Sequence, residues 1–319
     1  MDQQQNLIKQ LIEEKITVPT RENYIIQIQK MRRAVMTQDM PIDDQCEKIS
    51  IRGKVWKILL GIYKIDSFEY CDSGKTDDAK WENIFKDYSR TFRHDDIYEQ
   101  RKCSDKIVRL LNHVCAAIGS EDVTYLQGMN LIAGMFLAVM PELDSYYCTK
   151  KMILQLLPTY YGKNGKYYGV WWGCKLVFDC MKYIDPILYS HFYSSRSNPI
   201  VLMPCFNGLS SNTSPLNEAL ILWDYYFAKG CFNVVYITLA QLVSCRKILL
   251  QVPNPSAILK DLPSLQAKKL ILLAESFSQA IPCDLQKLVK QHTVSLDLNP
   301  FKDWKEITSE EQCFKKFFE

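Results

Sequence analysis

The sequence has little of what marks a secreted, membrane-spanning or nucleic-acid-binding protein. Its longest uncharged apolar stretch, residues 123–141, is interrupted by Gln127 and Asn130, whereas a membrane span needs roughly 20 apolar residues. The first five residues lack the basic and apolar regions of a signal peptide, so we expect none. The net charge is only +3, without a dense basic patch, which argues against nucleic acid or an anionic membrane as a partner.

Cysteine and histidine do not form a recognisable site either. The 12 cysteines stand singly, with no Cys-x-x-Cys pair, and the 4 histidines are scattered. A disulfide framework and a zinc site are therefore not indicated, and we expect a reduced cytoplasmic protein. A cysteine–histidine nucleophile pair stays open, although no local signature marks one cysteine.

Apolar residues recur at helical spacing through most of the chain, which predicts an all-α fold. Ile107, Leu111, Val114 and Ile118 share one face of a helix expected over residues 104–118. Because Pro, Gly or Asn bounds each segment, further helices are expected over residues 125–140, 174–184, 216–228, 234–250 and 268–279. No alternating apolar runs separated by hairpin turns occur, so strands should be scarce.

The first motif that could carry chemistry runs from Ile84 to Arg90. Ile84, Asp87 and Arg90 are spaced by three residues, so they are neighbours on a helical turn. One interpretation is a surface pair between Asp87 and Arg90 beside an anchoring isoleucine. The alternative is an arginine presented to a partner.

The second motif is Tyr125-Leu126-Gln127-Gly128-Met129-Asn130, at the start of an apolar helix. Thr124 followed three residues later by Gln127 fits a capping box, in which Gln127 only closes the helix start. The same position also suits catalysis, because a helix N-terminus offers amide groups and positive potential to a phosphate. Both interpretations stay open at this point.

Together the two motifs resemble the paired signature of the TBC (Tre-2/Bub/Cdc) family of Rab GTPase-activating proteins. That signature is Ile-x-x-Asp-x-x-Arg followed by Tyr-x-Gln-Gly-Met, and every defined position matches. Residues 52–61, an Arg-x-x-x-Trp block, and Leu222-Trp223-Asp224 resemble two further family segments. The resemblance implies a helical fold with two lobes, and divides the chain into an N-terminal arm (1–45), a TBC domain (46–295) and a C-terminal tail (296–319).

The resemblance also implies a function. The chain would stimulate GTP hydrolysis by a Rab- or Ras-like small GTPase, with Arg90 and Gln127 supplied in trans as catalytic residues. Asp87 would orient Arg90, and Tyr125 would contact the switch regions of the GTPase. The chain would catalyse no reaction of its own and hold no cofactor or metal, because the partner carries GTP and Mg. The alternative is an inactive TBC module that only binds a GTPase or a scaffold.

Residues 203–211, which continue through Pro215 into the Trp-Asp segment, narrow the resemblance to the short TBC proteins of yeast spindle-position checkpoints. Those proteins pair with a scaffold subunit and act on a Ras-like GTPase of mitotic exit. A location at the spindle pole, centrosome or basal body is implied by this resemblance alone. Two departures from the wider family are Ile221, where many members have arginine, and residues 207–211, which replace an aromatic-rich segment.

Overall fold

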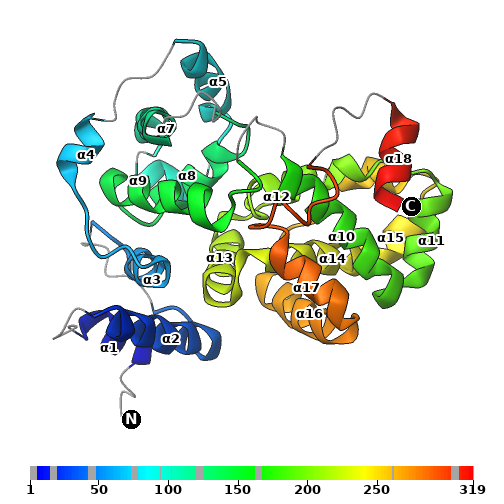
Figure 1. Ribbon diagram of the computed structural model, residues 1–319, viewed down its shortest axis with the longest axis horizontal. Helices are drawn as coiled ribbons and strands as arrows, with labels where there is room; N and C mark the ends of the chain where they lie inside the picture. Colours follow the sequence, from blue (N-terminus) through cyan, green and yellow to red (C-terminus); the bar gives the residue numbers. More distant parts are fainter. Residues whose placement is uncertain are drawn as a thin grey trace. The chain divides into compact units, whose positions relative to one another are not determined.

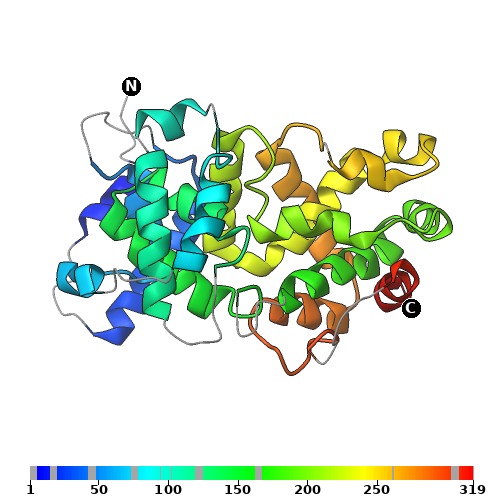
Figure 2. The ribbon, with the colours of Figure 1, turned by 90° about the horizontal axis from the view of Figure 1, so that it is seen from above.

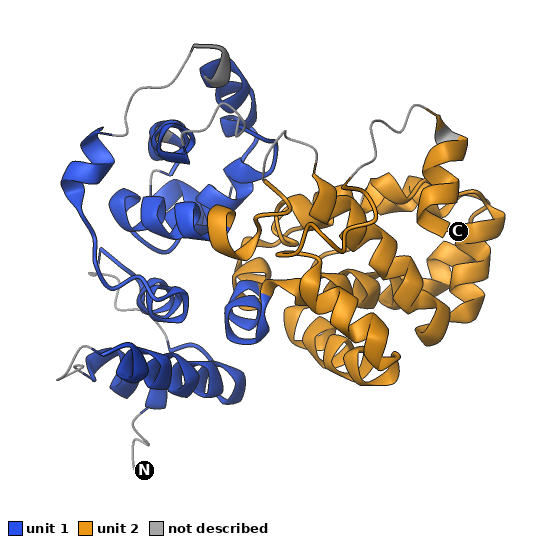
Figure 3. Ribbon diagram, viewed as in Figure 1, with its two compact units in different colours: residues 1–152, 223–230 blue, residues 153–222, 231–319 orange. Residues whose placement is uncertain are grey.

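The computed structural model describes residues 6–14, 20–41, 48–72, 78–93, 95–101, 103–118, 125–161, 167–260, 262–302 and 309–318. Within these ranges all regular elements are helices, which confirms the predicted all-α class (Figures 1 and 2). None of the helices described there is both long enough and apolar enough to cross a membrane. The chain divides into two compact units, in agreement with the expected two lobes (Figure 3).

Unit 1 comprises residues 1–152 and 223–230. Its helices are α1 (Leu7–Glu13), α2 (Arg21–Thr37), α3 (Ile51–Leu60), α4 (Ser67–Asp72), α5 (Asp78–Tyr88), α6 (Asp96–Gln100), α7 (Ser104–Ile118), α8 (Met129–Leu137) and α9 (Glu142–Lys151). Helix α7 packs against α5, α8 and α9, while α1 and α2 pack on each other and on α3.

The core of unit 1 is an aromatic cluster around Trp56 of α3. Its ring lies 5.8 Å from that of Phe136 and 5.6 Å from that of Trp223, and both tryptophans are fully buried. The Trp56 indole donates a 2.7 Å hydrogen bond to Asp224 Oδ1, and Arg52 Nε lies 3.1 Å from both carboxylate oxygens of Asp224. The Arg-x-x-x-Trp block and the late Trp-Asp pair therefore hold this core together.

Unit 2 comprises residues 153–222 and 231–319. It contains α10 (Tyr168–Ile184), α11 (Pro186–Ser194), α12 (Met203–Asn207), α14 (Val234–Ser244), α15 (Arg246–Gln251), α16 (Ala267–Ala280), α17 (Cys283–Gln291) and α18 (Glu310–Phe318), with the short 3₁₀ helices η3 (Pro199–Leu202), η4 (Cys231–Asn233) and η5 (Pro255–Lys260). Two elements cross the division between the units: η1 (Met152–Leu156) and α13 (Leu216–Lys229).

Helix α10 is the centre of unit 2 and packs against α11, α12, α14, α16, α17 and α18. Two glycines allow close approach to its surface. A Cβ on Gly169 would come within 2.1 Å of Thr159 Oγ1, and one on Gly173 within 2.3 Å of the Phe206 ring. Since only glycine fits such contacts, these two positions serve close packing.

Several predicted helices are found with shifted ends. The helix over residues 104–118 is observed with the predicted bounds, whereas the one expected from residue 125 begins only at Met129. The helix expected over residues 234–250 is broken at Cys245 into α14 and α15. There the Arg246 side chain bonds to Asp185, the N-cap of α11.

Both terminal segments contain helices. The proposed N-terminal arm holds α1 and α2, and Thr20 caps α2 by accepting from Asn23 N. In the proposed tail, α18 packs on α10, with Phe317 and Phe318 buried. The domain boundaries at residues 45 and 295 stay predictions.

Candidate functional site

The arginine motif lies at the end of α5. Ile84 is fully buried and anchors the helix, and Asp87 is only 6% exposed. The chain leaves the helix after Tyr88 and makes a turn over residues 89–93, which we call the arginine turn. Arg90 lies in this turn with its side chain 58% exposed, and its Nε donates a 2.9 Å hydrogen bond to Asp87 Oδ1. The expected neighbours do pair, but the carboxylate is buried, so this is not a simple surface ion pair.

The glutamine motif forms an irregular segment over residues 125–128 that ends in a turn at residues 127 and 128, directly before α8; we call this whole segment the glutamine turn. Gly128 is the N-cap of α8 and has a left-handed backbone, with φ at 105°. The exposed Gln127 therefore precedes the cap, whereas a capping box would require it inside the first helical turn. The capping-box interpretation is wrong for this reason; its other member, Thr124, lies outside the described residues.

Hydrogen bonds between side chains join the two turns. The Tyr125 hydroxyl donates to Asp87 Oδ2 at 2.6 Å, and the Asn130 amide donates to Thr91 Oγ1 at 2.8 Å. On the glutamine side, Gly128 N donates to Asn130 Oδ1 at 3.0 Å. On the arginine side, Thr91 Oγ1 donates to the Asp87 carbonyl at 2.8 Å. Two segments about forty residues apart are thus fixed against each other within unit 1.

This network places the predicted site residues and adds two that the sequence analysis missed. Arg90 and Gln127 are exposed on the joined turns, while Asp87 and Tyr125 are buried between them. Thr91 is 2% exposed and Asn130 is 4% exposed. The one local signal for Asn130 is its polarity on an otherwise apolar helix, and nothing in the sequence identifies its partner.

The alternative chemistry based on cysteine finds little support. Of the 11 cysteines in the described residues, 9 are buried, and none forms a disulfide. Burial raises the pKa of Cys103, Cys205 and Cys231 to about 12, so these thiols stay protonated at neutral pH. Two histidines are engaged in hydrogen bonds within the fold: His292 with the Tyr160 hydroxyl and the Val289 carbonyl, and His191 with the Val252 carbonyl.

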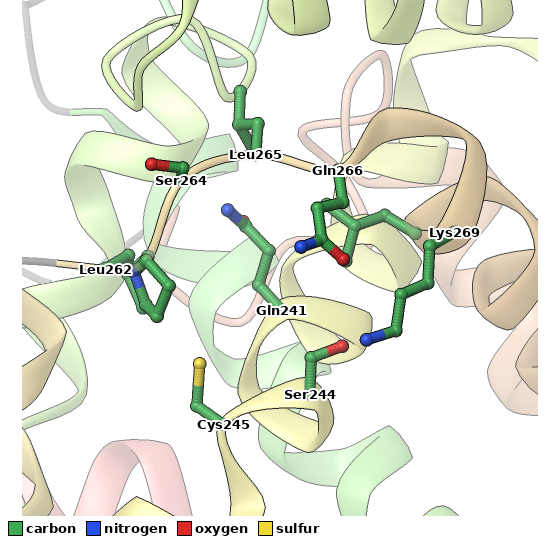
Figure 4. Close-up of a pocket in the computed structure, with 10 residues that line it drawn as sticks. Gln241, Ser244, Cys245, Leu262, Ser264, Leu265, Gln266 and Lys269 are labelled. Carbon is green, nitrogen blue, oxygen red and sulfur yellow. The ribbon is translucent and has the colours of Figure 1, made fainter.

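The described residues form neither a metal-binding cluster nor, in the hollow of unit 2, a cavity of nucleotide size. No three His, Cys, Asp or Glu side chains there gather closely enough to hold a metal ion. Unit 2 has a hollow of about 120 Å³ between the end of α14 and the start of α16, with Gln241, Cys245 and Lys269 in its lining (Figure 4). Pockets that hold small-molecule ligands commonly measure about 300 to 1,000 Å³, so this one is too small for a nucleotide.

The family of the chain follows from comparison with known proteins. The sequence model of the Rab-GTPase-TBC domain matches residues 49–250, which include both turns. The chain belongs to the Rab-GTPase-TBC family, whose members activate the GTPase of small GTP-binding proteins, and its partner is accordingly a small GTPase.

Two relatives are similar in sequence, and one solved structure shares the fold. A "putative mitotic check point protein BUB2" of Dictyostelium discoideum is 32% identical over 85% of this chain and 76% of its own length. The "cell division control protein 16" of Schizosaccharomyces pombe is 29% identical over 88% of this chain and 92% of its own. The Ypt/Rab-GAP domain of Gyp1p shares the fold, with a TM-score of 0.65 at 18% identity over 85% of this chain and 97% of that domain.

Proposed function

We propose that this chain accelerates GTP hydrolysis by inserting Arg90 and Gln127 into the nucleotide site of a bound small GTPase. The observation that carries the proposal is the hydrogen-bond network that joins the two turns. Arg90 is exposed but held by a buried carboxylate, and Gln127 is exposed on the turn to which that carboxylate is tied through Tyr125. Two side chains presented in this way suit delivery to another protein's active site.

Arg90 would act on the charge that develops during phosphoryl transfer. The transition state spreads negative charge over the transferred group and the leaving oxygen, and a small GTPase alone stabilises it poorly. The planar guanidinium offers several donors in a fixed fork, which a lysine ammonium does not. An arginine supplied in trans contributes a factor of about 10³ to 10⁵ in rate, or roughly 4 to 7 kcal/mol.

Gln127 would orient the attacking water in place of the GTPase's own glutamine. It stands immediately before the N-terminus of α8, where helix amides favour nearby negative charge. Asp87 would orient Arg90. Tyr125 is only 6% exposed and its hydroxyl is bound to Asp87, so we assign it to holding that carboxylate rather than to contact with the switch regions. GTP and Mg would be carried by the partner, and the chain would need no cofactor of its own.

The biological setting we propose is mitotic exit or a spindle-position checkpoint. The printed names of the relatives, which refer to a mitotic checkpoint and to cell division control, support it. Residues 203–211 resemble the checkpoint members of the family, which work with a scaffold subunit. We therefore propose a scaffold partner and a location in the cytoplasm and at the spindle pole, centrosome or basal body.

Single-turnover hydrolysis of GTP, measured on a panel of Rab- and Ras-like GTPases with and without a co-purified partner, tests the proposal. Arg90→Ala should lower the stimulated rate by about 10³ to 10⁵ and Gln127→Ala by about 10² to 10⁴, in neither case with a comparable change in KM. Arg33→Ala and Gln100→Ala, which alter exposed residues of the same types elsewhere in unit 1, are the matched controls.

Two outcomes would count against the proposal. If the wild-type chain is active and both Arg90→Ala and Gln127→Ala leave the stimulated rate of GTP hydrolysis unchanged, these two residues are not the catalytic ones. If no GTPase on the panel is stimulated under either condition while one is bound, the chain is an inactive TBC module that serves as a GTPase-binding or scaffold protein.

A further inference from the structure

Asn130 is a buried polar side chain in the first turn of an apolar helix. It is 4% exposed, and its neighbours Met129, Ile132 and Ala133 are fully buried. Burying a carboxamide is unfavourable unless both its oxygen and its nitrogen are hydrogen-bonded. Here both are: the nitrogen bonds to the arginine turn, and the oxygen bonds to Gly128 N and, at 3.3 Å, to the Tyr125 hydroxyl of the glutamine turn.

The nitrogen of the Asn130 amide acts as a hydrogen-bond donor and its oxygen as an acceptor. Its nitrogen donates to Thr91 Oγ1, whose own proton is given to the Asp87 carbonyl, so the hydroxyl has a lone pair to accept with. Its oxygen accepts from Gly128 N, next to Gln127 in sequence. The distance between the arginine turn and the glutamine turn is therefore spanned by one rigid side chain.

The arginine turn itself is strained and needs such support. Phe92 has a φ of 46°, a left-handed conformation that side-chain-bearing residues adopt rarely. Its ring packs edge-on against Tyr98, with centroids 5.5 Å apart. It also lies on Gly134, where an added Cβ would come within 2.8 Å of Phe92 Cε2 and 3.1 Å of Thr91 Cγ2. Asn130 and Gly134 are four residues apart, on one face of α8.

We infer that Asn130 and Gly134 are positioning residues of this site, which set where Arg90 lies relative to Gln127. Gln127 directly precedes the N-cap of α8, and the same helix receives the arginine turn through Asn130 and Gly134. Asn130 binds that turn through Thr91, and Gly134 lets it approach. The inference rests on the proposed roles of Arg90 and Gln127 and adds the residues through which their geometry is fixed.

Thr91→Val is the main test, because it keeps the shape of the side chain and removes the hydroxyl that Asn130 binds. We expect kcat of stimulated hydrolysis to fall about tenfold to a hundredfold while KM for the GTPase changes by less than about twofold. Thr91→Ser keeps the hydroxyl and should recover most of the rate. Thr149→Val, which removes a fully buried hydroxyl without a hydrogen-bond partner elsewhere in unit 1, should leave kcat unchanged.

A double-substitution cycle separates positioning from general stability. Once Arg90 is alanine, Thr91→Val should lower kcat by less than about twofold, because the side chain that it positions is gone. If Thr91→Val does not fold, Gly134→Ala provides the second variant. It should lower kcat by the same factor, and it is likewise combined with Arg90→Ala in a double-substitution cycle.

The inference is overturned if Thr91→Val, or Gly134→Ala in its place, lowers only the melting temperature. It is also overturned if the loss in kcat is equally large with and without Arg90. Failure of the proposed function looks different, since Arg90→Ala alone would then leave kcat at the wild-type value.

Discussion

His292 makes the stability of unit 2 depend on pH in a way that can be calculated. The side chain is fully buried after α17; its Nδ1 donates to the Val289 carbonyl at 2.7 Å, so its Nε2 accepts from the Tyr160 hydroxyl at 2.9 Å. The folded ring is therefore neutral, and a second proton at Nε2 would displace the hydrogen bond from the Tyr160 hydroxyl. Burial lowers the pKa of His292 from 6.5 to about 4.

The sign follows from which state binds the proton. Between pH 6.5 and pH 4 the unfolded chain protonates this histidine and the folded chain does not, so the free energy of unfolding falls as the pH is lowered. From pH 7.5 to pH 5 this one residue should remove about 2 kcal/mol of stability. The effect saturates below the folded-state pKa.

Urea unfolding of the wild type and of His292→Gln at several pH values measures the effect. Trp172, whose ring lies 6.4 Å from the imidazole, provides a local fluorescence signal, and circular dichroism reports the helices. All other titrating groups are common to both proteins, so the difference between their unfolding free energies isolates residue 292. That difference should shrink by about 2 kcal/mol between pH 7.5 and pH 5. A difference that does not vary with pH would refute the reasoning.

Three further substitutions test the site and the two cores. Asp87→Asn keeps the size of the side chain but removes the charge that holds Arg90, and should lower kcat in single-turnover assays about tenfold to a hundredfold with little change in KM; an unchanged kcat would count against Asp87 as the orienting residue. Asp224→Asn leaves the guanidinium of Arg52, 19% exposed, without its partner and should cost about 2 to 4 kcal/mol in urea unfolding; a cost below 1 kcal/mol would show that the ion pair matters little. Gly169→Ala drives a methyl group against Thr159 and should cost about 1 to 3 kcal/mol in the same assay; a neutral result would mean that the contact relaxes.

Much of the fold could be predicted because its signals are local. The helix over residues 104–118 has an uninterrupted apolar period, a serine at its start and a glycine after its end, and it is found where the pattern places it. The start of α8 could not be found in this way. Tyr125 and Leu126 are apolar and buried like helical residues, and periodicity contains no information about the left-handed backbone of Gly128 that delays the helix.

In the candidate site, too, the local contacts could be predicted from the sequence and the long-range ones could not. The pairing of Asp87 with Arg90 follows from a spacing of three residues, which fixes neighbours whatever the rest of the chain does. The pairing of Asn130 with Thr91 depends on how α8 packs against α5, and a buried amide gives no sign in the sequence of which distant hydroxyl it will meet. Long-range polar contacts of this kind become visible only once the packing is known.

Arg90 is tied close to its base, by bonds to a carboxylate that is itself buried. If Arg90 acts on GTP as proposed and keeps these bonds, its guanidinium stays close to the end of α5, and a GTPase has to bring its nucleotide to that point. Any bulky loop or modification on the GTPase that keeps the two surfaces a few ångströms apart would then leave its GTP intact. The chain would then select among GTPases by whether their shape lets the nucleotide reach Arg90, rather than by the strength of the contacts they make.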